Sequence, residues 1–318
     1  MAFPVSGTPW PTGSSNPNPA YSGNFIPEIW SGKVIEKFYD ATVIAAIANT
    51  DYEGEVRNQG DKVIIRTKPT LSIRDYEAEQ SLTLDRPSSN IVELLIDEGR
   101  YFATILDDVE EVQSDLNQLS MWAEDASEQM KIEIDTFVLS TIAADVVAAN
   151  KGIAAGRIST NVDLGVTGTP LVIAPRNAGA GQVEIIDAIT RLGQVLDEQN
   201  IPETGRWLVA PSWFCTQVKR SELRDASLTG DGQTMLRNGR LGMIDRFTVY
   251  MSNLLPLATG EYTIFAGHSH GLTFASQLSR IETIRAESTF GNILRGLQVF
   301  GSKVTDGTAI AAMVAGPA

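Results

Sequence analysis

The sequence has almost none of the side chains that bind metals through sulfur or imidazole. It contains one cysteine, Cys215, and two histidines, His268 and His270. A single cysteine excludes an intrachain disulfide and fits a cytosolic origin. Two histidines are too few for a metal site, and no cysteine or carboxylate stands at a telling spacing from them. We therefore expect no metal and no cofactor, and we expect Cys215, which follows Trp213 and Phe214, to lie in a core.

Positive charge and long apolar runs are also scarce. The 318 residues carry 25 lysines and arginines against 39 acids, a net charge of -14. This balance disfavours binding to a nucleic-acid backbone as the main function, because such sites need a basic surface. No apolar run approaches the roughly 18 residues of a membrane span, and no lysine or arginine precedes Lys33. We expect neither a membrane anchor nor a secretory signal. The length predicts two domains.

The first 27 residues carry no charge at all and hold six of the 14 prolines. Such a segment cannot build a core of its own and should be extended. Aromatic residues are nevertheless spaced through it, at Phe3, Trp10, Tyr21 and Phe25. Two interpretations stay open: a flexible tail, or an arm that becomes ordered on a neighbouring molecule with the aromatics as anchors.

One long stretch organises the chain. Between Gly99 and Gly152 there are 52 residues without glycine or proline, the two strongest interrupters of regular structure. Apolar residues recur in it at spacings of three and four, so they share one face of a helix. We predict a helix from Val109 to about Asn150, roughly 60 Å long at 1.5 Å per residue, with its apolar face against C-terminal strands near Val299 and Val304. The alternative is an ordinary core helix that is broken once near Ser120.

Before this helix, the sequence predicts another helix and a two-stranded excursion. The helix runs from roughly Ile29 to Asn49. Residues 62 to 97 form the excursion, with strand-like segments at 62–67, 71–76 and 91–96, a polar tip between them, and a turn at 97–99 into a strand at 100–106. A long isolated hairpin is marginal in water, so we expect this one to lie on a partner subunit.

After the long helix, helices and strands alternate. We predict helices at 183–199 and 211–220, and a mobile polar loop at 221–240. The predicted strands lie at 171–174, 207–210, 248–252, 262–266 and 272–275, with two more within 294–314 around Asp306–Gly307.

The segment Gly267-His268-Ser269-His270-Gly271 matches the nucleophile-elbow pattern of serine hydrolases. That fold needs a helix directly after the serine and a histidine further along the chain. Here a strand is expected to follow, and no histidine lies beyond His270. We favour a turn between two strands over a catalytic serine, and we predict no catalytic residue anywhere in the chain.

The order of these parts resembles the major capsid proteins of tailed bacteriophages, which have the Hong Kong 97-type fold. The resemblance covers most of the chain, and local runs carry it. They are Phe25-Ile26-Pro27-Glu28-Ile29-Trp30, Trp207-Leu208-Val209-Ala210-Pro211-Ser212-Trp213, Leu236-Arg237-Asn238-Gly239, Thr248-Val249-Tyr250-Met251-Ser252-Asn253 and Gly296-Leu297-Gln298-Val299-Phe300-Gly301. The implied fold class is α+β: a Hong Kong 97-like capsid fold with an N-terminal arm, an extended β-hairpin loop, a peripheral domain with a long spine helix, and an axial domain.

The resemblance implies a division of the chain into four parts. The N-terminal arm and first helix take residues 1–57, and the extended loop takes 58–106. The peripheral domain combines 107–150 with 290–318, and the axial domain takes 151–289. Where the sequence departs from the family, no long helical segment precedes the arm, so a fused scaffolding domain is not expected. Lys62 and Lys68 are the loop's only lysines and stand at its base, which argues against a covalent cross-link.

The implied function is a major capsid protein that self-assembles as hexamers and pentamers into an icosahedral head around double-stranded DNA. Implied partners are copies of itself, a separate scaffolding protein, a portal and, as a further possibility, a decoration protein. Neither sequence-specific nucleic acid nor a membrane is among them. The expected location is the virion, with assembly in the host cytoplasm. The alternatives are an encapsulin-like shell and a serine hydrolase using Ser269. Expected contact residues between subunits are Phe3, Trp10, Tyr21, Arg74, Glu77, Glu79, Asp85, Arg86, Arg224 and Asp231.

Overall fold

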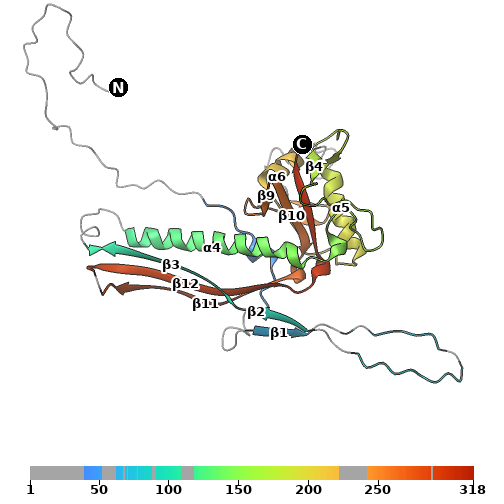
Figure 1. The fold of residues 1–318 in the computed structure, drawn as a ribbon, viewed down its shortest axis with the longest axis horizontal. Coiled ribbons are helices and arrows are strands. Elements are labelled where there is room, and N and C mark those ends of the chain that lie inside the picture. The colour runs from blue at the N-terminus through green and yellow to red at the C-terminus, as the bar shows by residue number, and fades with distance from the viewer. Residues whose placement is uncertain are drawn as a thin grey trace, which may run out of the picture. The chain divides into compact units, whose positions relative to one another are not determined.

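The computed structural model describes residues 39–51, 62–66, 69, 71–76, 78–87, 91–108, 118–221, 242–287 and 289–318. The chain divides into two compact units, Met1–Lys37 and Phe38–Ala318. The first unit lies outside the described residues, so everything below concerns the second (Figure 1). None of the helices in the described part of the chain is long and apolar enough to cross a membrane.

The longest helix is α4, Gln118–Asp145. It runs without interruption from Gln118 through Ser120, while residues 109–117 lie outside the described residues, so the predicted start at Val109 and the alternative of a break near Ser120 stay predictions. The predicted end at Asn150 is wrong by five residues. Val147 is extended, and Ala148–Asn150 form a separate short 3-10 helix, η1. The reason is tertiary: the side chain of Asn150 donates to the carbonyl oxygens of Thr308 and Ile310 at 2.7 and 2.9 Å.

One face of α4 packs on a sheet, as its apolar spacing predicts. Ile134, Val138, Leu139 and Ile142 are buried in a core that also holds Phe300 and Val304. The predicted contact near Val304 is confirmed. Val299, by contrast, belongs to a small core on the other side of the sheet, with Leu94, Ile96 and Ala275, because successive side chains of a strand point to opposite faces.

That sheet has three antiparallel strands in the order β11, β12, β3, namely Leu272–Arg285, Gly291–Val304 and Glu98–Asp107. Figure 1 shows α4 running alongside its long strands. The other pair, β1 (Lys62–Arg66) and β2 (Ile91–Leu95), is antiparallel with Lys62 opposite Leu95 and Arg66 opposite Ile91. This pairing gives residues 62–97 the two-stranded base that the sequence predicts.

Two local predictions for the extended loop are wrong. Residues 71–76 form no strand; all six side chains are exposed, so the segment lacks the half-buried surface that supports a strand. The turn at 97–99 does not make a hairpin either. β2 pairs with β1, whereas β3 pairs with β12, so the chain passes from one sheet to another at this point.

The remaining strands form an eight-stranded sheet. Its order is β5, β4, β13, β10, β6, β8, β7, with β9 paired to β10. The strands are β4 (Leu171–Ala174), β5 (Gln182–Glu184), β6 (Arg206–Ala210), β7 (Met243–Ile244), β8 (Phe247–Met251), β9 (Leu257–Ala258), β10 (Glu261–His268) and β13 (Ile310–Pro317). Helices α5 (Ile185–Glu198) and α6 (Ser212–Arg220) share one core with this sheet, in which Cys215 is buried as expected.

Two short turns join the two large sheets. The chain passes from β10 through η3 (Ser269–Gly271) into β11, and from β12 through η4 (Gly307–Ala309) into β13. The backbone N–H of Thr305 donates to the carbonyl oxygen of Gly271 at 2.9 Å and holds the two turns together. The predicted turn at 267–271 and the predicted strands around Asp306–Gly307 are both confirmed.

These connections also bear on how the chain divides. β11 precedes residue 290 but pairs with β12, and β13 follows it but pairs with β10 and β4. The sheets therefore exchange strands across the predicted boundary between the axial and peripheral domains. The four-part division itself stays a prediction.

The helix predicted at Ile29–Asn49 is reduced, within the described residues, to one turn, α1 (Ile44–Ile47). Residues 39–43 are not helical, and 29–38 lie outside the described residues. A side chain from α4 determines where this turn begins. The carboxylate of Asp135 accepts from the backbone N–H groups of Val43 and Ile44, and Val43, Ile44 and Ile47 are buried beside α4.

Candidate assembly surfaces

The extended loop exposes large apolar side chains on its described residues. Ile73 is 95% exposed and Leu84 is 90% exposed, and Leu71, Tyr76 and Leu82 are also exposed. At the base of the loop the situation is different. Leu94 and Ile96 are buried against Ala275, with Val63, Ile65 and Val299 packed around them. The loop is therefore fixed to its own subunit at the base, whereas the apolar residues beyond the base have no cover.

The structure brings together two of the charged residues predicted for the tip of the loop. Arg74 donates to both carboxylate oxygens of Asp85, at 2.9 and 3.0 Å. Both side chains are about half exposed, so the pair contributes at most about 1 kcal/mol to stability. Its consequence is geometric, because it joins the two arms of the loop. Glu79 and Arg86 are both exposed, and Glu79 has a left-handed backbone with φ 69°.

The other predicted contact residues fall where the structure gives no description. These are Phe3, Trp10, Tyr21, Glu77, Arg224 and Asp231. Their roles stay predictions.

A second exposed surface lies on the three-stranded sheet. Along β3, exposed and less exposed residues alternate strictly from Glu98 to Ile105. Tyr101 is 79% exposed and stands opposite Leu297, which is 40% exposed. Beside them Arg295 donates through Nε to Glu282 at 2.6 Å, and Arg280 pairs with the same carboxylate at 2.9 Å. The hydrogen bond from Arg295 lowers the pKa of Glu282, so this carboxylate stays ionised.

Sequence reasoning did not identify Tyr101 and Leu297. The available signal was the alternation of β3, which marks a strand with one face toward its own core and the other face open.

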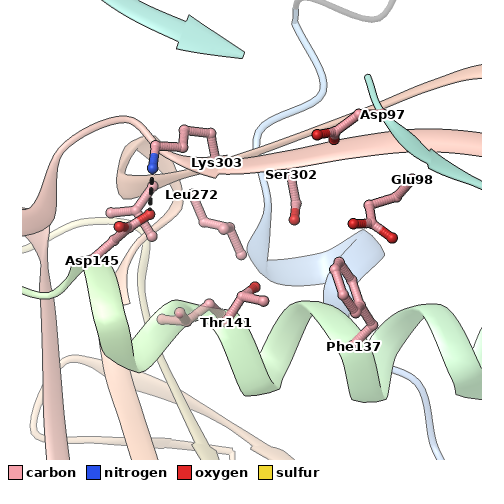
Figure 2. Close-up of a pocket in the computed structure, with 10 residues that line it drawn as sticks. Asp97, Glu98, Phe137, Thr141, Asp145, Leu272, Ser302 and Lys303 are labelled. Atoms are coloured by element: carbon pink, nitrogen blue, oxygen red, sulfur yellow. Dashed lines mark hydrogen bonds and ion pairs between the residues drawn. The ribbon is translucent and has the colours of Figure 1, made fainter. Parts of the chain in front are cut away.

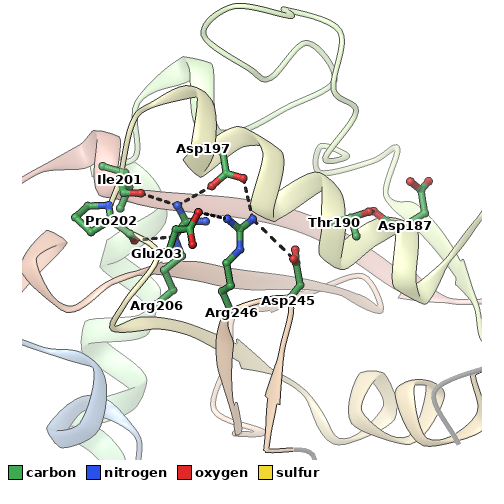
Figure 3. A network of polar contacts seen from close by, with 9 residues as sticks. All are labelled: Asp187, Thr190, Asp197, Ile201, Pro202, Glu203, Arg206, Asp245 and Arg246. Atoms are coloured by element: carbon green, nitrogen blue, oxygen red, sulfur yellow. Dashed lines mark hydrogen bonds and ion pairs between the residues drawn. The ribbon is translucent and has the colours of Figure 1, made fainter. Parts of the chain in front are cut away.

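A third surface, at one end of the eight-stranded sheet, contains a network of charged side chains that pair with one another (Figure 3). The side chain of Arg206 is fully buried. It donates to the carbonyl oxygens of Ile201 and Pro202 at 2.6 and 2.9 Å, and it pairs with Asp197 at 2.7 Å. Arg246 reaches the same Asp197 at 2.8 Å, as well as Glu203 at 3.0 Å. Because each arginine has a carboxylate partner, their charge is tolerated at this position.

The network fixes a tight turn between β7 and β8. The turn residues Asp245 and Arg246 both have positive φ, 45° and 68°, a conformation that usually selects asparagine and glycine. Burial raises the pKa of Asp245. Burial would also raise the pKa of Asp197, but hydrogen bonds from Arg246 and Arg206 outweigh it and lower that pKa. The turn is held in an uncommon backbone conformation by side chains that cross-link it to α5.

Beside this network, Glu198 organises the loop at residues 156–160. Its carboxylate accepts from the backbone N–H groups of Ile158 and Ser159 at 2.7 and 3.1 Å. Burial opposes ionisation, yet these bonds hold the pKa of Glu198 at about 2. Arg157 donates to the carbonyl oxygen of the same residue at 2.8 Å. The loop is thereby fixed, and it presents Ile158 with 73% of its surface exposed.

A small groove of about 190 Å³ lies where the end of α4 meets β12 (Figure 2). Lys303 crosses its edge and pairs with Asp145 at 2.8 Å. Thr141 lines the groove but donates its hydroxyl to the carbonyl oxygen of Val138. Because Lys303, Asp145 and Glu98 on its wall all form ion pairs within the subunit, we assign the groove a structural role in joining α4 to the sheet.

The segment around Ser269 has no hydrolase geometry. Nδ1 of His268 accepts from the backbone N–H of His270 at 3.1 Å, and so stabilises the turn. Burial lowers the pKa of His268, which favours the neutral imidazole that this bond requires. Among the residues that the structure describes, no group of three or more histidines, cysteines or acids could hold a metal ion.

An extended apolar loop on a rigid body, with open sheet surfaces beside it, is typical of a structural protein that assembles. The comparison with protein families identifies which one. The family model described as phage capsid protein matches residues 98–313, so the chain belongs to the phage capsid protein family. It is a capsid shell protein of the virion and not an enzyme, which excludes the hydrolase alternative. No curated protein matches the chain.

Solved structures confirm the fold implied by the resemblance. A chain from Mycobacterium phage Che8 has a TM-score of 0.72 at 24% identity and covers 91% of this chain and 97% of its own length. The capsid of cyanophage P-SCSP1u has a TM-score of 0.69 at 15% identity, with 92% and 94% covered. The capsid of the native GTA particle has a TM-score of 0.65 at 15% identity, with 93% and 98% covered.

Proposed function

We propose that this capsid protein is the major capsid protein of a tailed phage, which self-assembles as hexamers and pentamers into an icosahedral head around double-stranded DNA. Family membership supports a shell, and the uncovered apolar surface of the extended loop supports self-assembly. Ile73 and Leu84 are each at least 90% exposed. Burying such side chains on another copy contributes about 1.5–3 kcal/mol each.

In this proposal the extended loop lies across the adjacent subunit. The pair Arg74–Asp85 determines register and partner choice more than affinity, because both side chains remain accessible to water. The arm at residues 1–27, with Phe3, Trp10 and Tyr21, contacts a further neighbour, and the loop around Arg224 and Asp231 lines the axis of each ring. A scaffolding protein, a portal and a decoration protein are proposed partners, and assembly takes place in the host cytoplasm.

The charge of the chain supports a container for DNA rather than a DNA-binding protein. A net charge of -14 repels a polyanion, so packaged DNA is expected to be confined without tight binding. Sequence-specific contacts with nucleic acid have no place in this mechanism.

Electron microscopy of the purified protein, with mass determination and nuclease protection, tests the proposal. We expect closed particles with rings of five and six subunits, and virions that protect double-stranded DNA. Only small soluble species, under all assembly conditions and with a scaffolding protein supplied, would contradict self-assembly. Particles that hold protein cargo instead of DNA would favour the encapsulin-like alternative.

A further inference from the structure

A groove of about 570 Å³ runs along the solvent side of α5, and we refer to it as the α5 groove. Its charged lining consists of four carboxylates and two guanidinium groups, from Asp187, Asp197, Glu198, Asp245, Arg191 and Arg246. The acids therefore outnumber the bases by two. At physiological ionic strength this excess is felt over about 8 Å, so the groove favours a cationic partner.

Bonds within the subunit cross-link the walls of the groove. Arg246 ties the turn between β7 and β8 to Asp197 and Glu203. Glu198 fixes the loop that places Ile158 on the groove wall. A preorganised surface loses little conformational entropy on binding, and an exposed apolar side chain on a rigid loop is a suitable anchor for an interface.

A complementary cationic surface lies on the same sheet's other helix. Lys219 and Arg220 occupy the last turn of α6. Neither forms an ion pair with a described residue, although this chain has more acids than bases. Both helices pack on the same core of the eight-stranded sheet, but the groove follows α5 and the two cations stand at the end of α6. The two surfaces are thus distinct, as a head-to-tail contact requires.

We infer that the α5 groove of one subunit receives Lys219 and Arg220 of a second copy of this chain, around the ring of a pentamer or hexamer. This inference rests on the proposed function, because a closed ring of identical subunits needs one heterologous contact repeated at each step. Beyond the proposed function, the inference names the two faces of the subunit that meet at this contact. Copies with a charge of -14 repel one another, so local pairs of opposite sign at the contact specify the correct neighbour.

Charge reversal on each face, and on both faces together, tests the inference. The groove variant is Asp187→Lys with Thr190→Lys, and the α6 variant is Lys219→Glu with Arg220→Glu. Each is expected to lower the yield of particles at least about tenfold, because like charges then meet at every contact. The combination restores opposite charges, and its yield is expected within about threefold of the wild type.

A matched control separates this contact from an effect of net charge. Glu124→Lys with Gln129→Lys changes two exposed residues of α4 by the same charge as the groove variant. Combined with the α6 variant, the control has the same net charge as the combined groove and α6 variants, but it places no opposite charges at the contact. It should therefore not recover the yield of particles. Equal recovery with this control, or no recovery with the groove variant, overturns the inference.

Two further measurements keep the outcome interpretable. Melting of dissociated subunits, followed by circular dichroism, should agree among all variants within a few degrees. If a charge-reversed variant melts much lower than the wild type, the neutral substitutions Asp187→Asn and Arg220→Gln take its place. Each is expected to lower the yield of particles, but by less than the charge reversal does. Absence of particles from the wild type contradicts the proposed function itself, whereas full assembly of every variant contradicts only the α5–α6 contact.

Discussion

The carboxylate of Asp135 accepts a hydrogen bond from the backbone N–H of Val43 at 2.5 Å, although 92 positions separate them in the sequence. A second bond, 3.2 Å long, comes from Ile44. Asp135 is 5% exposed, so the bonds form away from water. This one side chain fixes the point at which the N-terminal part of the chain enters the body beside α4.

Removing the Asp135 carboxylate should destabilise the subunit. Asp135→Leu leaves the two backbone N–H groups without an acceptor, at about 1–3 kcal/mol for each group that stays buried. Asp135→Asn keeps one acceptor oxygen and should lose less. Chemical denaturation of free subunits measures both, with the exposed Glu124→Gln as a control expected within about 0.5 kcal/mol of the wild type. Equal stability of Asp135→Leu and wild type would contradict this anchor.

Gly301 marks a second close approach, between β12 and the end of β2. A Cβ at this position would lie 2.0 Å from the carbonyl oxygen of Leu95 and 3.2 Å from Cα of Ile96. Both are backbone atoms and cannot rotate away. Gly301→Ala should therefore separate the base of the extended loop from the sheet and cost several kcal/mol, as overpacking in a core does.

Gly99 provides the matched control for that substitution, because no atom lies within 4 Å of a Cβ built there. We expect Gly99→Ala to be neutral or slightly stabilising, since alanine restricts the unfolded chain. Thermal melting of the two variants makes the comparison. If Gly301→Ala melts with Gly99→Ala, the close packing of β12 on β2 is wrong.

Periodicity was sufficient for the parts of the fold that bury one face of a regular element. The spacing of apolar residues predicted the face of α4 that holds Ile134 and Phe137, and alternation predicted β12 and β13. It did not predict the end of α4, because Asn150 is held by the backbone of Thr308 and Ile310, and such long-range bonds leave no local signal.

For the candidate surfaces, too, the sequence identified some of the residues and not others. The sequence placed Arg74 and Asp85 near the loop tip as expected contacts with a neighbour, but it did not predict that they pair with each other within the subunit. The network around Arg206 and Arg246 was not predicted. Its members come from α5, β6 and the turn before β8, and no sequence spacing reports that these elements meet.

Glu198 predicts a dependence of stability on acid. Its pKa is about 2 in the folded protein, below the usual value of about 4.3. A carboxylate whose pKa is lowered by folding stabilises the protein at pH values above its usual pKa. That stabilisation is lost as the pH falls from about 4.5 toward 2. Glu198→Gln should melt lower than the wild type at pH 6, and the gap should narrow toward pH 2.5. A gap that stays constant would mean that the carboxylate does not hold the loop around Ile158.

The exposed side chains of the extended loop allow a test that separates folding from assembly. Ile73 and Leu84 are almost fully accessible in the subunit, so Ile73→Asp and Leu84→Asp should change the stability of free subunits by no more than about 0.5 kcal/mol. In a shell, the same charges would have to be buried on the neighbour without a partner, which costs several kcal/mol at each contact. We expect normal melting of the subunits and a severe loss of particles. Thr83→Asp, which adds the same charge to the same loop without removing an apolar side chain, should reduce the yield less.

Hydrogen exchange reports directly on where the loop lies. Residues 71–76 and 80–87 form no helix or strand, so their amides should exchange quickly in free subunits. When the loop lies across an adjacent subunit, those amides are shielded and should exchange slowly in particles. Amides of the paired strands β1 and β2 are an internal reference, because their hydrogen bonds are present in both states. Equal protection of residues 71–87 in subunits and particles would show that the loop rests on its own body, and the contact between subunits would have to be placed elsewhere.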